Sequence, residues 1–312
     1  MKRFFLVFAL ALSVAATNTE TWAAEKLTVM LDWFPNVDHV PLYVARDKGF
    51  LRDAGIDAEF LSPSETADAL KLAAAGQVDL AVGYQPQMIV AASAGIEVRA
   101  VGRLVGHPLS TLLFLKGKGI EKPSDLTGKK IGYTVPGMMD VLLKAFAERN
   151  GITRYEAVNV GFTIVPSLAT GAVDAIMGPF KNYETVELEH KNLAPQWFEL
   201  EKYGIPDYDE LIVVAGAKTL AARRAVVRSF VGCVAKGIEW TRKHPDEALE
   251  LYFAAVPEAP RDMEREAFRR TLSQYAVSQR FDRDRWKEFA AFAFRAGLIE
   301  REVSVDALVE DN

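Results

Sequence analysis

Cysteine, histidine motifs and clustered positive charge are scarce in this sequence. The one cysteine, Cys233, has no partner for an internal disulfide, and it lies in the apolar stretch RSFVGCVAKGIEW, where a small buried hydrophobic residue is expected. The four histidines are scattered, with no HExxH motif and no cysteine cluster. Since metal sites need such clusters, we predict no metal.

Positive charge does not dominate the chain. There are 37 Lys and Arg against 42 Asp and Glu, for a formal net charge of -5, and no dense Lys/Arg stripe. Proteins that bind nucleic acid through its phosphates usually carry a basic excess, so we do not expect nucleic acid as the main partner. The chain also lacks a GxSxG nucleophile motif, and GKGKG near residue 117 lacks the spacing of a nucleotide-binding loop. We therefore predict neither an enzyme nor a cofactor site.

The N-terminus has the layout of a secretory signal peptide. Lys2 and Arg3 precede the apolar run FFLVFALALSVAA, and small residues follow. The run is shorter than the ~20 residues of a spanning helix. We expect cleavage after Ala23, with Ala24 and Ala16 as alternative sites, which makes 1–23 the signal peptide. The mature chain would then be exported, most simply to a bacterial periplasm.

The rest of the chain alternates short apolar strands with helices, which predicts α/β architecture with parallel sheets covered by helices on both faces. Its 312 residues exceed what one core usually organises, so we expect two lobes. The stretch HVPLYVARDKGFLRDAG, for example, is predicted as one helix ending at Gly49 or Gly55.

An internal repeat indicates two lobes that share the same order of helices and strands. LAAAGQVDLAVG at 72–83 resembles LATGAVDAIMG at 168–178. We interpret 111–115 and 211–215 as the segments that cross between lobes. The first lobe would comprise 25–111 plus 216–312, and the second 112–215. Ligands of open α/β sheets bind beyond the carboxyl ends of the strands, so a ligand cleft is expected between the lobes, closed by hinge bending.

Polar and aromatic residues gather where predicted strands end. LDWFPNVDH follows the first strand, and GYQPQM, YTVPGMMD and GPFKNYETVE follow three others. Aromatic faces, amides and carboxylates suit a flat, neutral or weakly basic heteroaromatic ligand, and N–H groups at a helix start suit an acceptor atom. The candidate ligand-binding residues are Asp32, Trp33, Asn36, His39, Tyr84, Gln85, Pro136, Gly137, Asn182, Tyr183 and Glu184.

Each candidate also has an ordinary structural explanation. Trp33 is equally consistent with a core residue, Asp32 with a helix cap, and His39 with a local hydrogen bond at a helix start. Tyr84 and Gln85 lie in a turn next to proline. Charged helix residues such as Glu184 usually face solvent, although we favour an inward Glu184.

The motifs LDWFPNVDHVPLYVARDKGFLRDAGID, AAGQVDLAVG, SDLTGKKIGY and NYETVEL resemble the thiamine-pyrimidine family of periplasmic-binding-type proteins. The resemblance covers essentially the whole mature chain. It implies a type II periplasmic-binding-protein fold, with two α/β lobes joined by two crossover strands. It also implies the substrate-binding subunit of an ABC importer that salvages formylaminopyrimidine or hydroxymethylpyrimidine, with an inner-membrane permease as partner.

Fungal relatives in this family are enzymes that make the pyrimidine from their own histidine and pyridoxal phosphate. That branch carries a CCCFC segment, which is absent here, and a lysine and a histidine at positions that align with Gly83 and Gln87. Without the lysine no Schiff base forms. The resemblance therefore implies a binding protein, for which a monomer is the default.

Other functions stay open at this stage. Related importers carry riboflavin, sulfonates or nitrate. A sulfonate or nitrate site needs a cation, for which Arg103 is the nearest candidate. A pyrimidine-synthase-type enzyme, a hydrolase using His39 with Asp38, and a sensory ligand module are the alternatives of other classes.

Overall fold

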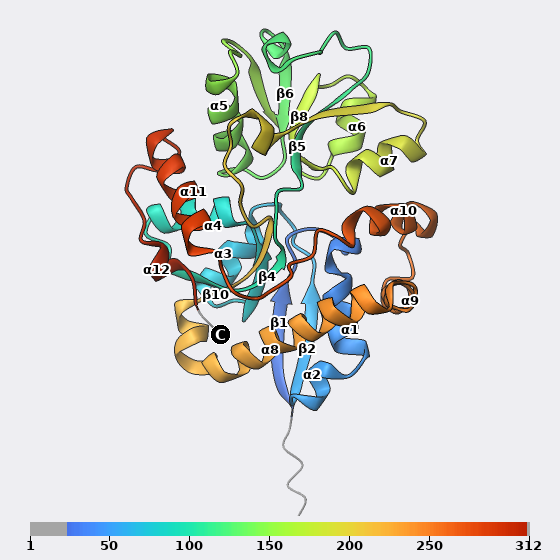
Figure 1. Ribbon diagram of the computed structural model, residues 1–312, viewed down its shortest axis with the longest axis vertical. Helices are drawn as coiled ribbons and strands as arrows, with labels where there is room; N and C mark the ends of the chain where they lie inside the picture. Colours follow the sequence, from blue (N-terminus) through green and yellow to red (C-terminus); the bar gives the residue numbers. More distant parts are fainter. Residues whose placement is uncertain (1–23, 311–312) are drawn as a thin grey trace, which may run out of the picture.

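The structure is a computed structural model that describes residues 24–310. The predicted signal peptide at 1–23 lies outside the described residues. Two five-stranded sheets lie one above the other in Figure 1, each with its own helices. We call the sheet that contains the first strand, with the helices packed on it, the first lobe, and the other sheet with its helices the second lobe.

The two sheets have the same strand plan. The first has the order β2-β1-β3-β10-β4 and the second β7-β6-β8-β5-β9. Central strands such as β3 and β10 are buried along their whole length, as expected of continuous apolar runs covered on both faces. The strands are β1 Glu25–Met30, β2 Ile56–Leu61, β3 Leu80–Gly83, β4 Val98–Val105, β5 Ser110–Leu115, β6 Lys130–Tyr133, β7 Glu156–Asn159, β8 Ala175–Phe180, β9 Pro195–Glu199 and β10 Leu211–Gly216.

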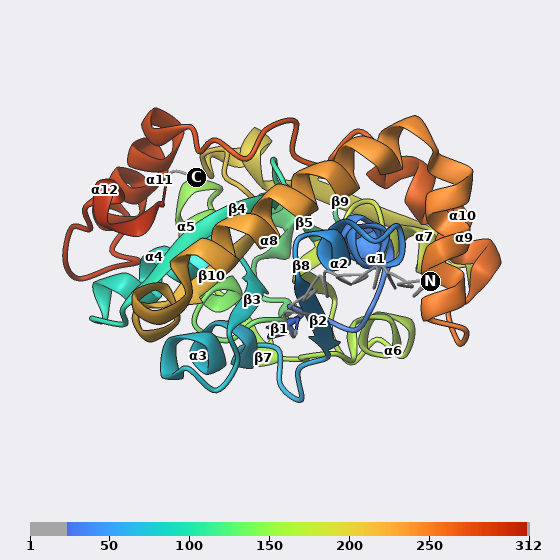
Figure 2. The same cartoon turned by 90° about the horizontal axis from the view of Figure 1, so that it is seen from below.

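Helices cover the sheets, and α8 crosses the first sheet diagonally when seen from below (Figure 2). Helix α10 follows α9 and lies against both the first lobe, at η1, and α7 of the second lobe. The helices are η1 Val37–His39, α1 Val40–Asp47, α2 Phe50–Asp53, α3 Asp68–Ala75, α4 Gln85–Ser93, η2 Pro123–Leu126, α5 Met139–Arg149, α6 Ile164–Ala169, α7 Glu184–His190, η3 Leu200–Tyr203, α8 Ala217–Lys243, α9 Pro245–Ala255, α10 Arg261–Thr271, α11 Arg283–Arg295 and α12 Val305–Leu308.

The internal repeat coincides with equivalent positions in the two sheets. The first copy ends in β3 and the second runs into β8, and each of these strands is the third of its sheet. Each lies parallel to the strand on one side and antiparallel to the strand on the other. The sequence similarity thus reflects a shared strand plan.

The prediction of parallel sheets is wrong in one strand per sheet. β10 is antiparallel to β3 and β4, and β5 is antiparallel to β8 and β9. Both begin directly after the chain has passed from one sheet to the other, so they enter the sheet from the cleft side and run opposite to its parallel strands.

The expected crossing segments therefore lie within the sheets. Residues 111–115 belong to β5 of the second sheet. Residues 211–215, predicted to lie in the second lobe, belong to β10 of the first sheet. The chain passes between sheets at 106–109 and again between η3 and β10. Of the two ends predicted for the first helix, Gly49 agrees with the structure and Gly55 does not, because the chain breaks between α1 and α2 at Gly49, whose φ is +83°.

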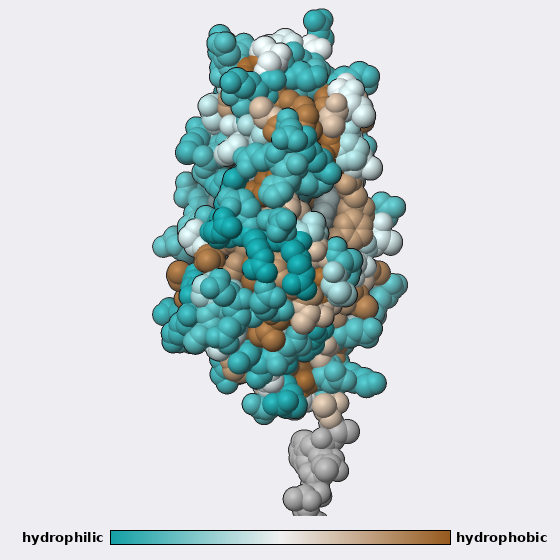
Figure 3. All heavy atoms as spheres, turned by 90° about the vertical axis from the view of Figure 1, so that its right-hand side faces the viewer, coloured by the Kyte–Doolittle hydropathy of each residue, from teal (hydrophilic) through white to brown (hydrophobic). Residues whose placement is uncertain are grey.

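The largest apolar cluster draws residues from both sheets, and a smaller one lies within the second lobe around Leu113, Ile176 and Leu188. Between residues 24 and 310 no helix combines the length and the apolar character needed to cross a bilayer. Hydrophilic residues cover most of the face on the side of α7 and α10, with apolar residues in small groups (Figure 3).

Candidate ligand-binding site

A small cavity of about 20 Å³ lies between the lobes, at the ends of β1, β3, β6 and β8. Ligand sites range over roughly 300–1,000 Å³, so in this arrangement the lobes leave space for about one water molecule, and they must move apart to admit a ligand. Six of the predicted residues line it, and they come from both lobes: Asp32, Trp33, Asn36, Tyr84, Tyr183 and Glu184.

Asp32 is the centre of a buried polar group in the first lobe. Its Oδ1 lies 2.8 Å from Nε2 of His39, and its Oδ2 accepts a hydrogen bond of 2.8 Å from the Tyr84 hydroxyl. The Asn36 N–H donates to Nδ1 of His39 at 3.3 Å, which places the imidazole proton on Nε2, facing Asp32. Burial, together with the charge of Asp32, raises the pKa of Tyr84. The carboxylate is thus held in one orientation at the cavity wall.

Local sequence explains this arrangement. Asn36 caps η1, because its side-chain oxygen accepts a hydrogen bond of 2.9 Å from the Asp38 N–H. The His39 ring in turn accepts one from the Asn36 N–H. This reciprocal cap fixes the turn after β1. Asp32 and His39, seven residues apart, therefore meet across one tight turn.

Glu184 is the carboxyl group that the second lobe contributes. It begins α7, and its Oε2 accepts from the Phe180 N–H at 2.7 Å. Burial raises the pKa of Glu184 to about 8, and the bond from Phe180 offsets only part of that effect. A buried carboxyl group at the cavity wall is costly unless it serves a partner.

Aromatic rings form the outer edge of the cleft. Trp33 lies edge-on to Phe162 with ring centroids 4.5 Å apart, and Phe34 lies 4.7 Å from the same ring. Since Trp33 and Phe34 follow β1 and Phe162 follows β7, these contacts join the two lobes. Trp33 is half-buried and Phe34 is 50% exposed.

The other five predicted residues do not line this cavity. His39 lies behind Asp32. Gln85 is buried and accepts the Asp209 N–H at 2.8 Å, and Asn182 donates to Asp38 at 2.8 Å. Pro136 and Gly137 lie in the loop before α5, where the Gly137 N–H donates to Asp140 instead of facing the cavity.

Six further lining residues were not among the candidates: Thr134, Val135, Met139, Ile164, Gly178 and Phe180. Thr134 and Val135 follow directly after β6, so the strand-end rule locates them. Gly178 has a φ of +117°, and a Cβ there would lie 2.1 Å from the Thr134 hydroxyl. Met139 lies in the stretch YTVPGMMD that follows a predicted strand, whereas Ile164 is an ordinary apolar helix residue that no motif marks.

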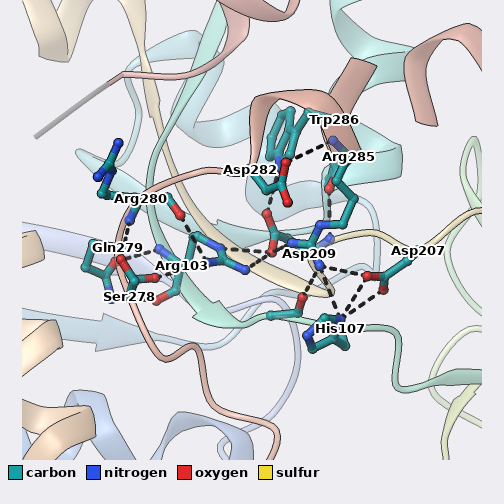
Figure 4. A network of polar contacts seen from close by, with 12 residues as sticks. Arg103, His107, Asp207, Asp209, Ser278, Gln279, Arg280, Asp282, Arg285 and Trp286 are labelled. Carbon is teal, nitrogen blue, oxygen red and sulfur yellow. Dashed lines mark hydrogen bonds and ion pairs between the residues drawn. The ribbon is translucent and has the colours of Figure 1, made fainter. Parts of the chain in front are cut away.

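Arg103 belongs to a buried network beside the two passages between sheets, not to the cavity (Figure 4). Its Nε and Nη2 donate to Asp209 at 2.9 and 2.6 Å. Arg285 and the Trp286 indole N–H, both from α11, converge on the same carboxylate. The network ties the returning passage to the first lobe.

A family model described as NMT1/THI5 like matches residues 36–248. The chain belongs to the NMT1/THI5-like family. A Haemophilus influenzae protein named for thiamine biosynthesis is 34% identical over 309 residues, 98% of each chain. The formylaminopyrimidine-binding protein of Halalkalibacterium halodurans is 34% identical, over 81% of this chain and 78% of its own. A Legionella pneumophila 4-amino-5-hydroxymethyl-2-methylpyrimidine phosphate synthase is 26% identical, over 90% of this chain and 89% of its own.

Solved structures place this NMT1/THI5-like chain in the periplasmic-binding-protein fold. The alkanesulfonate-binding protein of Xanthomonas axonopodis superposes with a TM-score of 0.72 at 15% identity, over 91% of this chain and 98% of its own. The prediction of that fold is confirmed.

The charge of the cavity separates possible ligands of this NMT1/THI5-like protein. Its described lining residues include two carboxyl groups and no Lys, Arg or His. Within residues 24–310, no group of three or more His, Cys, Asp and Glu is placed to hold a metal ion. The cavity can accept hydrogen bonds from a neutral or cationic ring, and it offers no countercharge to an anion.

Proposed function

We propose that this protein is the periplasmic substrate-binding subunit of an ABC importer and that it captures a thiamine pyrimidine precursor, formylaminopyrimidine or hydroxymethylpyrimidine, by closing its two lobes. The observation that carries the proposal is the interlobe cavity, which combines aromatic walls with Asp32 and Glu184 and has no cation among its described lining residues. The formylaminopyrimidine-binding relative supports the same ligand class.

The lining residues have complementary roles in this proposal. Trp33 and Tyr84 offer faces on which a ring stacks, each aromatic pair adding about 0.5–1.5 kcal/mol beyond area burial. The Glu184 carboxyl accepts a hydrogen bond from an exocyclic amine. Asp32 is held by His39 and Tyr84 and accepts from a second donor of the ligand.

Closure follows from the distribution of these contacts. A ligand that touches Asp32 of the first lobe and Glu184 of the second binds the closed state better than the open one, and only such differential affinity shifts the equilibrium. Export through the signal peptide would bring the protein to the periplasm. The closed form would then dock there on a permease in the inner membrane.

The alternatives fit the cavity less well. A sulfonate or nitrate lacks a countercharge there, since Arg103 pairs with Asp209. A flavin is larger than a single pyrimidine ring, so the lobes, which leave a cavity of about 20 Å³, would have to move further apart for the flavin than for the pyrimidine. For a synthase, Gly83 and Gln87 supply neither a Schiff-base amine nor a sacrificial histidine.

Uptake of labelled pyrimidine by cells tests the importer role. We expect uptake to be lost when the gene is deleted, to return with the wild-type gene, and to stay low with Glu184→Ala. Normal uptake in the deletion strain would instead favour a sensory module. Purified protein that retains pyridoxal phosphate, visible by its absorbance, would favour the synthase.

A further inference from the structure

Two carboxyl groups that do not line the cavity hold the lobes together. Asp38 of η1 accepts a hydrogen bond of 2.8 Å from Nδ2 of Asn182, which follows β8 of the second lobe. Glu264 of α10 accepts a hydrogen bond of 2.9 Å from the hydroxyl of Tyr183, the residue after Asn182. Asp38 is 0% and Glu264 1% exposed. Closure thus brings Asn182 and Tyr183 onto two acids of the first lobe.

Three oxygen atoms in this group have no hydrogen donor within residues 24–310: Oδ2 of Asp38, Oδ1 of Asn182 and Oε2 of Glu264. Buried acceptors without donors are rare and costly. A proton on Asp38 Oδ2 changes that atom into a donor, and the amide oxygen of its own partner, Asn182, is an acceptor. Protonation therefore removes one of the acceptors that have no donor.

The surroundings favour the neutral acids. Burial raises the pKa of Asp38 to about 7, although the neighbouring His39 and the bond from Asn182 act against it. Burial likewise raises the pKa of Glu264 to about 7, with the Tyr183 bond opposing and the charge of Asp38 adding to the rise.

Hydrogen bonds from Thr271 to Asp38, and from Tyr252 and the Val37 backbone to Glu264, also favour the charged acids, but burial outweighs them. Among the described residues, the titratable groups that act on the two acids are Asp32 and His39 next to η1, Tyr183 and Glu184 at α7, Tyr252 of α9 and Tyr275 after α10. Arg242 of α8 acts on Tyr275 and donates to its carbonyl oxygen, not to either acid.

We infer that the lobes close with protons on Asp38 and Glu264, so that ligand capture takes up protons and weakens as pH rises. This inference rests on the proposed capture by lobe closure. Opening removes Asn182 and Tyr183 from the two acids and lets water reach them, which returns each pKa toward its ordinary value near 4. The two acids are positioning residues for binding, because they act through the closed geometry without touching the ligand.

Proton linkage gives the sign and the size of the change in ligand affinity with pH. Asp38 and Glu264 have a higher pKa in the closed form than in the open form. The free energy by which protonation favours closure is therefore fully present below about pH 4 and is lost as pH rises through about 7. Each acid then lowers the affinity about tenfold between pH 6 and pH 8. At pH 7 each acid is half protonated when closed, so closure takes up about one proton through the pair.

Calorimetry with formylaminopyrimidine at pH 7, in buffers of different ionisation enthalpy, counts these protons. Asp38→Asn and Glu264→Gln each mimic the protonated acid, and each is expected to reduce the proton uptake by about half a proton relative to wild type. Thr66→Val is the matched control, since Thr66 makes a bond of 2.8 Å to the Thr134 carbonyl across the cleft without a titratable group. It is expected to leave the proton uptake unchanged.

An uptake that is the same in wild type and in either acid variant overturns the inference for that residue. Absence of pyrimidine binding at every pH is instead a failure of the proposed function. Small-angle scattering of the ligand-free protein then decides the inference. We expect the radius of gyration to increase from pH 5 to pH 8.5 in wild type and to stay constant in the double variant Asp38→Asn/Glu264→Gln. A constant wild-type radius overturns it.

Discussion

Replacing Glu184 by glutamine separates what this side chain contributes to binding from what its burial costs the fold. The substitution keeps the shape and leaves an amide oxygen to accept the Phe180 N–H, a bond of 2.7 Å in the wild type. The other terminal atom becomes an NH₂ group. It then presents a donor to the exocyclic amine, where the wild type presents an acceptor.

At pH 8.5, above the pKa of about 8, the Glu184 carboxylate is charged, and the expected loss is that of a hydrogen bond to a charged group, about 1.5–3 kcal/mol. This corresponds to about 10- to 150-fold weaker binding of the pyrimidine. The effect on stability has the opposite sign. Because burial raises the pKa of Glu184 to about 8, its contribution to wild-type stability is lost as pH rises through that value. The variant should therefore be at least as stable as wild type at pH 8.5, with a difference that shrinks toward pH 5.

Calorimetry gives the dissociation constant, and thermal unfolding at the two pH values gives the stability. Glu187→Gln is the matched control, since Glu187 lies in the same helix, pairs with Lys191 and does not line the cavity. It should change affinity less than about twofold, the scale of an exposed ion pair. An unchanged dissociation constant for Glu184→Gln would remove this residue from the site.

Three further substitutions test other parts of the account. Trp33→Ala should weaken pyrimidine binding by about 1 kcal/mol or more in calorimetry, with little change in circular dichroism, because Trp33 is only half-buried. Gly178→Ala should lower the free energy of unfolding by about 1–3 kcal/mol, since φ is +117° and a threonine hydroxyl occupies the Cβ position, whereas Gly232→Ala, with open space around it, should not. Asp209→Asn should lower the free energy of unfolding by about 3–5 kcal/mol in urea, against about 1 kcal/mol or less for the more exposed Asp207→Asn. Equal effects of the two aspartate variants would show that the buried network of Arg103, Asp209 and Arg285 does not stabilise the fold.

Sequence reasoning located the cavity because a general rule of α/β sheets applies. Carboxyl ends of parallel strands converge, so the polar residues after β1, β3 and β8 had to lie near one another. Asp32, Tyr84 and Glu184 meet this expectation as lining residues. The shared strand plan of the lobes was likewise visible, because the repeat covers a whole turn and strand.

What the sequence did not reveal depends on contacts between distant segments. Asp38 and Asn182 are 144 residues apart, and no local pattern pairs them. Ile164 lines the cavity as an ordinary apolar residue. The antiparallel strands β5 and β10 follow from the path of the chain between sheets, and their apolar sequences do not indicate direction.

The most direct test of the account is a calorimetric titration of the chain after unfolding and refolding to remove any carried ligand. Formylaminopyrimidine, hydroxymethylpyrimidine, riboflavin and a small alkanesulfonate would be added in separate runs. The account predicts submicromolar binding of a pyrimidine and no heat from the flavin or the sulfonate. Silence for both pyrimidines together with binding of riboflavin or the sulfonate would contradict the proposed ligand.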